Sequence, residues 1–204
     1  NTNSNETTGT TNSSVSSSIA GLWTFNLLET SGYVNGYPQY TAGYFRTENE
    51  IGKKNNLNEM SYGADAQLVS NNLIFGLTAV NIIYGYEIQS SSSSAFSGKS
   101  GTLLSAYAMY NTDNHTMAVE LSKDALNNIA LKSSLQGFSM NFDYAFHFRF
   151  FPEFYRSPYG NNFGEFSYPA NEAGLYSAFN WKISRSFIER LYIDLYRSIG
   201  PTYY

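Results

Sequence analysis

The stretch Gly137–Arg149 reads GFSMNFDYAFHFR and decides the predicted fold class of the chain. Its even-numbered positions are large and apolar, whereas its odd-numbered positions are small or polar. Successive side chains of a β-strand point to opposite faces, so this period of two predicts one strand with an apolar and a polar face.

The same alternation recurs along the chain and predicts an all-β protein. Turn-forming residues separate the alternating segments at Asn71-Asn72, Thr112–Asn114 and Ser184–Ser186. Several segments run to about ten residues, the length that a tilted membrane strand needs. The alternating segments are Met60–Val69, Leu73–Tyr84, Thr102–Asn111, His115–Leu121, Ile129–Gln136, Leu175–Ile183 and Glu189–Tyr196, with weaker ones at Gly21–Leu28 and Gln39–Thr47.

Composition favours a membrane barrel over an ordinary soluble domain. Charged residues make up 14% of the 204 residues, below the value of about 25% that is usual for soluble domains. The mean hydropathy of -0.33 is that of a soluble protein but does not exclude a barrel, because barrel strands average lipid-facing apolar residues with lumen-facing polar ones. The chain has no cysteine, which excludes disulfides and thiolate metal sites.

We therefore predict an antiparallel up-and-down transmembrane β-barrel, or a partial barrel, of about eight to ten strands. Tyrosines near strand ends are candidates for an aromatic girdle, namely Tyr84, Tyr86, Tyr107, Tyr110, Tyr192 and Tyr196. The predicted lumen-facing residues are Asn141, Asp143, His147 and Arg149. The predicted lipid-facing residues are Phe138, Met140, Phe142, Tyr144, Phe146 and Phe148.

Two regions differ in composition. Residues 1–18 are mostly Asn, Thr, Ser, Gly and Glu, which predicts a disordered polar segment or a loop. Residues 19–204 are expected to form the barrel. An outer-membrane protein must be exported, and no signal peptide opens the sequence, so we expect a fragment of a longer chain.

Two groups of motifs carry a family resemblance. The first is Arg46-Thr47-x-x-Glu50, before a predicted strand. The second is Tyr159-Gly160-Asn161-x-Phe163-x-Glu165, followed by Asn171-Glu172-x-Gly174. Both resemble the C-terminal outer-membrane barrel region of large Gram-negative envelope proteins that carry an N-terminal helix-hairpin-helix domain. That domain is absent here, so the resemblance implies a β-barrel in the bacterial outer membrane and no bound nucleic acid.

Few residues are candidates for chemistry. Arg46, Glu48 and Glu50 belong to one dense charge cluster, which fits a salt-bridged loop or, alternatively, a surface for a ligand or a periplasmic or envelope partner. Glu153, Glu165 and Glu172 lie in an irregular, aromatic-rich stretch that fits a plug or gate. His147, near Asp143 and Arg149, fits a polar lumen network better than a metal site. No metal or cofactor is expected.

We predict a structural, pore or transport role in the outer membrane, with lipid as the main partner and without catalysis. One alternative is a secreted or periplasmic β-sandwich that binds glycans through Trp23, Tyr155, Tyr159 and Trp181. A third reading is an all-β glycoside hydrolase, which needs two facing carboxylates from Glu153, Glu165 and Glu172.

Overall fold

The chain folds into β-strands joined by turns and loops. The computed structural model describes residues 15–28, 30–34, 37–40, 47–48, 57–89, 96–157, 164–165 and 169–201, with the backbone alone for residues 15–40 and Leu57. The strands are β1 (Val15–Leu28), β2 (Thr30–Val34), β3 (Tyr37–Tyr40), β4 (Leu57–Ser70), β5 (Leu73–Ile88), β6 (Gly98–Asn111), β7 (His115–Lys123), β8 (Ile129–Gly137), β9 (Phe142–Phe151), β10 (Glu172–Lys182) and β11 (Ile188–Arg197).

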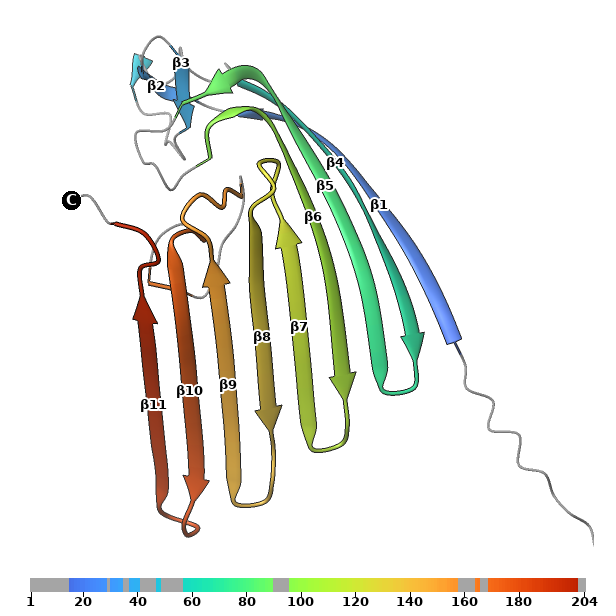
Figure 1. The fold of residues 1–204 in the computed structure, drawn as a ribbon, viewed down its shortest axis with the longest axis vertical. Coiled ribbons are helices and arrows are strands. Elements are labelled where there is room, and N and C mark those ends of the chain that lie inside the picture. Colours follow the sequence, from blue (N-terminus) through green and yellow to red (C-terminus); the bar gives the residue numbers. More distant parts are fainter. Residues whose placement is uncertain are drawn as a thin grey trace, which may run out of the picture.

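Nine of these strands form a single curved sheet (Figure 1). Its order is β1-β4-β5-β6-β7-β8-β9-β10-β11, and every neighbouring pair is antiparallel. The short strands β2 and β3 pair with each other in a separate hairpin between β1 and β4. The large sheet does not close, so the predicted all-β, up-and-down architecture is confirmed as a partial barrel.

The two ends of the sheet differ in their connections (Figure 1). Short turns at one end join β4 to β5, β6 to β7, β8 to β9 and β10 to β11. The connections at the opposite end include the longer segments 89–97 and 152–171. At the tightest turn, Asn71 adopts a φ of 47°, a left-handed conformation that Asn tolerates better than most residues. The predicted turns at Asn71-Asn72, Thr112–Asn114 and Ser184–Ser186 are confirmed.

The prediction of one uninterrupted strand over Gly137–Arg149 is wrong. β8 ends at Gly137, β9 begins at Phe142, and residues 138–141 form the turn between them. Backbone hydrogen bonds fix this turn, from Phe138 N to Asn114 O (2.9 Å) and from Ser139 N to Phe142 O (3.0 Å). Phe138, Met140 and Asn141 are therefore exposed turn residues that lie on neither face of a strand.

The strand register sorts the side chains of β4–β11 onto two faces. On one, which we call the apolar face, one row of partners runs Phe75, Ala108, Val119, Ser133, Phe148, Leu175 and Leu195. The adjacent row toward the loops runs Leu77, Ala106, Leu121, Leu131, Phe150 and Ala173 and ends at Arg197. Among the paired residues of β4–β11, the charged ones on the apolar face are Lys123, Glu189 and Arg197, and each lies at or next to a strand end.

Most of the large side chains on the apolar face are exposed. Leu77 is 65% exposed, Leu121 50% and Val119 42%. Apart from Ala170, the buried apolar residues of the described chain instead form two small clusters near the loops. One holds Ile82, Tyr84 and Ile88, and the other Ala130, Phe151 and Tyr155.

No helix in the described ranges is long and apolar enough to cross a membrane.

Candidate functional site

The opposite side of the sheet, which we call the polar face, carries cross-strand networks of hydrogen bonds. On β4, β5 and β6 the Thr78 hydroxyl donates to Asp65 (2.6 Å), and the Gln67 side-chain amide donates to the Tyr107 hydroxyl (2.6 Å). The Tyr107 ring covers its cross-strand partner Gly76, where a Cβ would collide with it. An aromatic ring over a glycine shields exposed backbone and fixes strand register.

The middle of the polar face carries a partly exposed ion pair. Lys132 Nζ on β8 lies 2.8 Å from Glu120 Oε2 on β7, with about a third of each side chain exposed. Ion pairs of this exposure contribute little to stability, about 0–1 kcal/mol.

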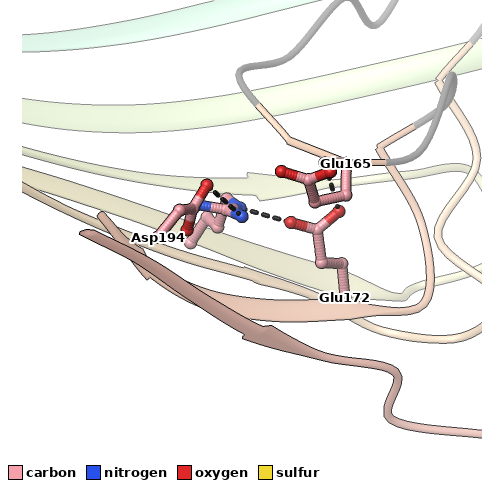
Figure 2. A network of polar contacts seen from close by, with 4 residues as sticks. Glu165, Glu172 and Asp194 are labelled. Carbon is pink, nitrogen blue, oxygen red and sulfur yellow. Dashed lines mark hydrogen bonds and ion pairs between the residues drawn. The ribbon is translucent and has the colours of Figure 1, made fainter. Parts of the chain in front are cut away.

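Arg149 on β9 is the centre of the most buried polar network, shown in Figure 2. Its side chain is fully buried and lies between two carboxylates. Nε donates to Glu172 Oε1 on β10, while Nη1 and Nη2 donate to the two Asp194 oxygens on β11 at 3.0 and 3.1 Å. The second Glu172 oxygen accepts from the Glu165 backbone N–H (3.1 Å), which ties a loop residue to the network.

The Asn171-Glu172-x-Gly174 motif builds the surroundings of Arg149. A Cβ at Gly174 would lie 2.6 Å from the Arg149 Cζ atom, so any larger residue there would have to displace the guanidinium. Asn171 has a φ of 57° and is buried, and its Oδ1 accepts from the backbone N–H groups of Ile199 (3.1 Å) and Gly200 (2.7 Å). The motif thus fixes an ion pair and anchors the segment that follows β11.

The first part of the β9–β10 loop folds back over the polar face. The Tyr155 ring packs on Phe151, and its hydroxyl lies 3.0 Å from the Ser122 hydroxyl of β7. Asp124 accepts from Arg156 N (2.9 Å), and the Asn128 side-chain amide donates to Phe154 O (2.8 Å), which ties this loop to the β7–β8 turn. Burial raises the pKa of Tyr155 above its usual value, so the phenol stays neutral.

A cavity of about 220 Å³ lies beside this anchored loop. Glu120, Lys132 and Ser122 of the sheet line it together with Tyr155 and Ser157 of the loop. Apolar side chains, among them Val80, Leu103 and Phe151, line the rest of the cavity, so its wall is amphipathic.

The predicted residues of β9 share faces as the alternation indicated. Phe142, Tyr144, Phe146 and Phe148 lie on the apolar face. Asp143, His147 and Arg149 lie together on the polar face, where Asp143 accepts from the Asn180 side-chain amide (2.8 Å).

The two predicted groups of charged residues, Arg46, Glu48 and Glu50 and the glutamates Glu153, Glu165 and Glu172, are only partly described or brought together. Arg46 and Glu50 lie outside the described residues, while Glu48 and Glu165 are exposed. Glu172 joins the Arg149 network, whereas the Glu153 carboxylate lies against Gly200. Glu153 and Glu172 therefore have different immediate partners.

The aromatic residues proposed for a glycan cleft do not converge where they are described. Trp181 lies on the apolar face, whereas Tyr155 packs on the polar face. The Tyr159 position and the Trp23 side chain lie outside the described part.

The girdle assignment requires correction. The register places Tyr84, Tyr107, Tyr192 and Tyr196 on the polar face, and Tyr86 lies beyond the regular pairing of β5 with β6. The aromatic residues that lie on the apolar face near the short turns are Tyr110, Phe142, Tyr144, Phe179 and Trp181.

No group of three or more His, Asp or Glu residues in the described ranges is arranged to hold a metal ion. In comparisons with family models, curated proteins and solved structures, nothing matches this chain.

Sequence reasoning missed two anchoring carboxylates. Alternation placed Asp194 on one face with Tyr192 and Tyr196, but its contact with Arg149 depends on the register of three strands. Asp124 precedes a turn, where an Asp that accepts from following backbone N–H groups is a common pattern. Such a signal could have indicated the hydrogen bonds from the Leu126 and Asn128 backbone N–H groups, but not the one from Arg156 in the next loop.

Proposed function

We propose that this chain forms part of the wall of a bacterial outer-membrane β-barrel and serves a structural, pore or transport role. In this proposal the apolar face contacts lipid, and the polar face lines the interior. Membrane lipid is the principal partner, and no catalytic step is assigned to the chain.

The observation that carries the proposal is that the apolar face exposes large apolar side chains and has charged residues only at strand ends. Its central rows expose large aliphatic and aromatic side chains such as Val119, Leu121 and Phe148, while its charges stay at strand ends. Exposed apolar patches on soluble monomers rarely exceed a few hundred Å². A face of this kind across β4–β11 is typical of a surface that meets hydrocarbon.

The lengths and connections of the strands support the same proposal. β4 and β6 have 14 residues each, β5 has 16, and β9 and β11 have 10. A tilted strand needs about 9–11 residues to cross the hydrocarbon core. Short turns at one end and longer loops at the other are the usual arrangement of outer-membrane barrels.

The polar face supports an interior role. Its charged and polar groups are paired across strands by the Arg149 and Tyr107 networks. The loop anchored through Tyr155 lies on this same face. In a barrel this loop would narrow the interior near the loop end, and the adjacent cavity with Glu120 and Lys132 would line the remaining passage.

A charge placed on the apolar face tests the proposal. Val119 is at the centre of β7 and is already 42% exposed, so Val119→Arg would be nearly neutral in a water-soluble protein. Facing lipid near the midplane, it should cost about 2–4 kcal/mol of unfolding free energy. The measurement is reversible urea unfolding of the complete polypeptide in bilayers, followed by tryptophan fluorescence.

Ile129→Arg is the matched control. Ile129 lies on the same face and is exposed, but it begins β8 beside Lys123 at the loop end. Near an interface the same change should cost only about 0–1 kcal/mol. Equal and small effects at the two positions, with a monodisperse variant in the absence of detergent, would reject the membrane assignment.

A further inference from the structure

The two edge strands of the open sheet run in the same direction. Each neighbouring pair is antiparallel, and an even number of reversals separates β1 from β11. Figure 1 shows the arrowheads of β7, β9 and β11 all at the loop end. Direct pairing of β1 with β11 would therefore be parallel, unlike every other pairing in the large sheet.

Neither outer edge has a partner strand in the described part of the chain. β1 has 14 residues and β11 has 10, enough for each to cross the hydrocarbon core. Unpaired backbone N–H and C=O groups in hydrocarbon cost several kcal/mol each, so a membrane sheet cannot leave such edges open. Both edges require further hydrogen-bonding strands.

We propose that an odd number of additional transmembrane strands lies between β11 and β1 in the complete barrel. The added strand beside β11 is antiparallel to β11, and the added strand beside β1 is antiparallel to β1. This inference rests on the proposed membrane function. The odd number follows from the common direction of β1 and β11, because only an odd number of inserted strands keeps every pairing antiparallel. The complete barrel then has an even number of strands, as single-chain bacterial barrels do.

A second copy of this sheet does not satisfy the same requirement. A copy inserted in the same orientation presents edges that run in the same direction as β1 and β11. Every seam between the two copies would then be parallel. The occupant that fits is polypeptide beyond the described strands, with apolar and polar residues alternating at period two.

The exposed side chains of β11 indicate what its neighbour presents. Leu191, Ile193 and Leu195 continue the apolar face, and Tyr192 and Tyr196 stand exposed on the polar face. The rings of Tyr107 and Tyr144 each cover a glycine on the neighbouring strand. The strand beside β11 should therefore carry apolar residues opposite Leu191, Ile193 and Leu195. It should carry glycine or another small residue opposite Tyr192 or Tyr196.

Disulfide trapping in the complete polypeptide, in outer membranes, tests this seam. These 204 residues contain no cysteine, and any cysteine elsewhere is replaced by serine. Ile193→Cys is combined in turn with a cysteine at each position from 15 to 28, followed by mild oxidation. Ser177→Cys with Ile193→Cys is the positive control, because these residues are cross-strand partners.

The proposal expects a disulfide in the control and none between β11 and any position of β1. An intramolecular β1–β11 disulfide would overturn it in favour of parallel closure. An intermolecular disulfide between Ile193→Cys in one copy and a cysteine of β1 in another would overturn it in favour of a second copy.

Hydrogen exchange of the unmodified complete protein gives an independent readout. The proposal expects β11 amides to be as protected as those of β10, whereas exchange typical of a free edge would overturn it. These readouts are separate from Val119→Arg, which probes the face of β7 and not the seam. If Val119→Arg left the unfolding free energy unchanged, the membrane function would be rejected. A β1–β11 disulfide would reject only the proposal of additional strands between β11 and β1.

Discussion

The guanidinium of Arg149 lies against the backbone of Gly174, in space that any other residue would fill with its side chain. A Cβ at position 174 would lie 2.6 Å from Cζ and 2.8 Å from Nε of Arg149. This close approach leaves Arg149 fully buried between Glu172 and Asp194. The network therefore links β9, β10 and β11, and the guanidinium crosses the middle strand at Gly174, where no side chain is in its way.

Gly174→Ala should displace Arg149 and weaken the network. We expect a loss of about 1–3 kcal/mol in unfolding free energy, the cost of overpacking a filled site, measured by urea titration in bilayers. Gly85→Ala is the control, because its nearest contact would be Asn58 Cβ at 3.3 Å. Equal losses of unfolding free energy for the two variants would show that the contact between Gly174 and Arg149 does not contribute to stability.

The two carboxylates that bind Arg149 should contribute unequally. The Glu172 side chain is 3% exposed and that of Asp194 is 22% exposed. Removing one partner of a buried ion pair costs about 3–5 kcal/mol, so we expect a loss in this range for Glu172→Ala. Asp194→Ala should cost less, because water can partly replace the carboxylate.

Glu120→Ala serves as the reference for this pair of variants. It breaks an ion pair in which about a third of each side chain is exposed, and the expected loss is about 0–1 kcal/mol. The same unfolding measurement applies to all three variants. A Glu120→Ala loss as large as that of Glu172→Ala would contradict this ranking.

Asn171 should hold the segment after β11 in place. Asn171→Gly keeps the left-handed backbone accessible but removes the hydrogen bonds to Ile199 and Gly200. We expect faster hydrogen exchange at residues 199–200, with the β7–β8 hairpin unaffected. Unchanged exchange at these two residues would show that other contacts anchor the segment.

Tyr155 should make stability depend on alkaline pH. Burial raises its pKa in the folded state, so folding favours the neutral phenol. Its contribution is complete below the unfolded pKa, about 10, and is lost as pH rises through the higher folded pKa. Tyr155→Phe should reduce the fall in stability above pH about 10, as measured by unfolding at a series of pH values. An unchanged alkaline slope would contradict this role.

The period-two pattern predicted the strand type and the faces of Asp143, His147 and Arg149, because alternation is a local property of a strand. It did not reveal the break between Gly137 and Phe142, since the apolar even positions continue through the turn at Phe138 and Met140. The contact between Arg149 and Asp194 depends on the register of three strands and therefore required coordinates. The girdle prediction was wrong for Tyr84, Tyr107, Tyr192 and Tyr196, which lie on the polar face, whereas Tyr110 does lie on the apolar face near a short turn.

Spin labels on adjacent residues of β7 test most directly whether the apolar face meets lipid. Val119 and Ala118 point to opposite faces at almost the same depth, and the cysteine-free sequence allows one label at each. In bilayers, a label at Val119→Cys should be accessible to oxygen and shielded from a water-soluble nickel reagent, and a label at Ala118→Cys should show the reverse. Equal accessibility of both labels to the nickel reagent would contradict a lipid-facing wall.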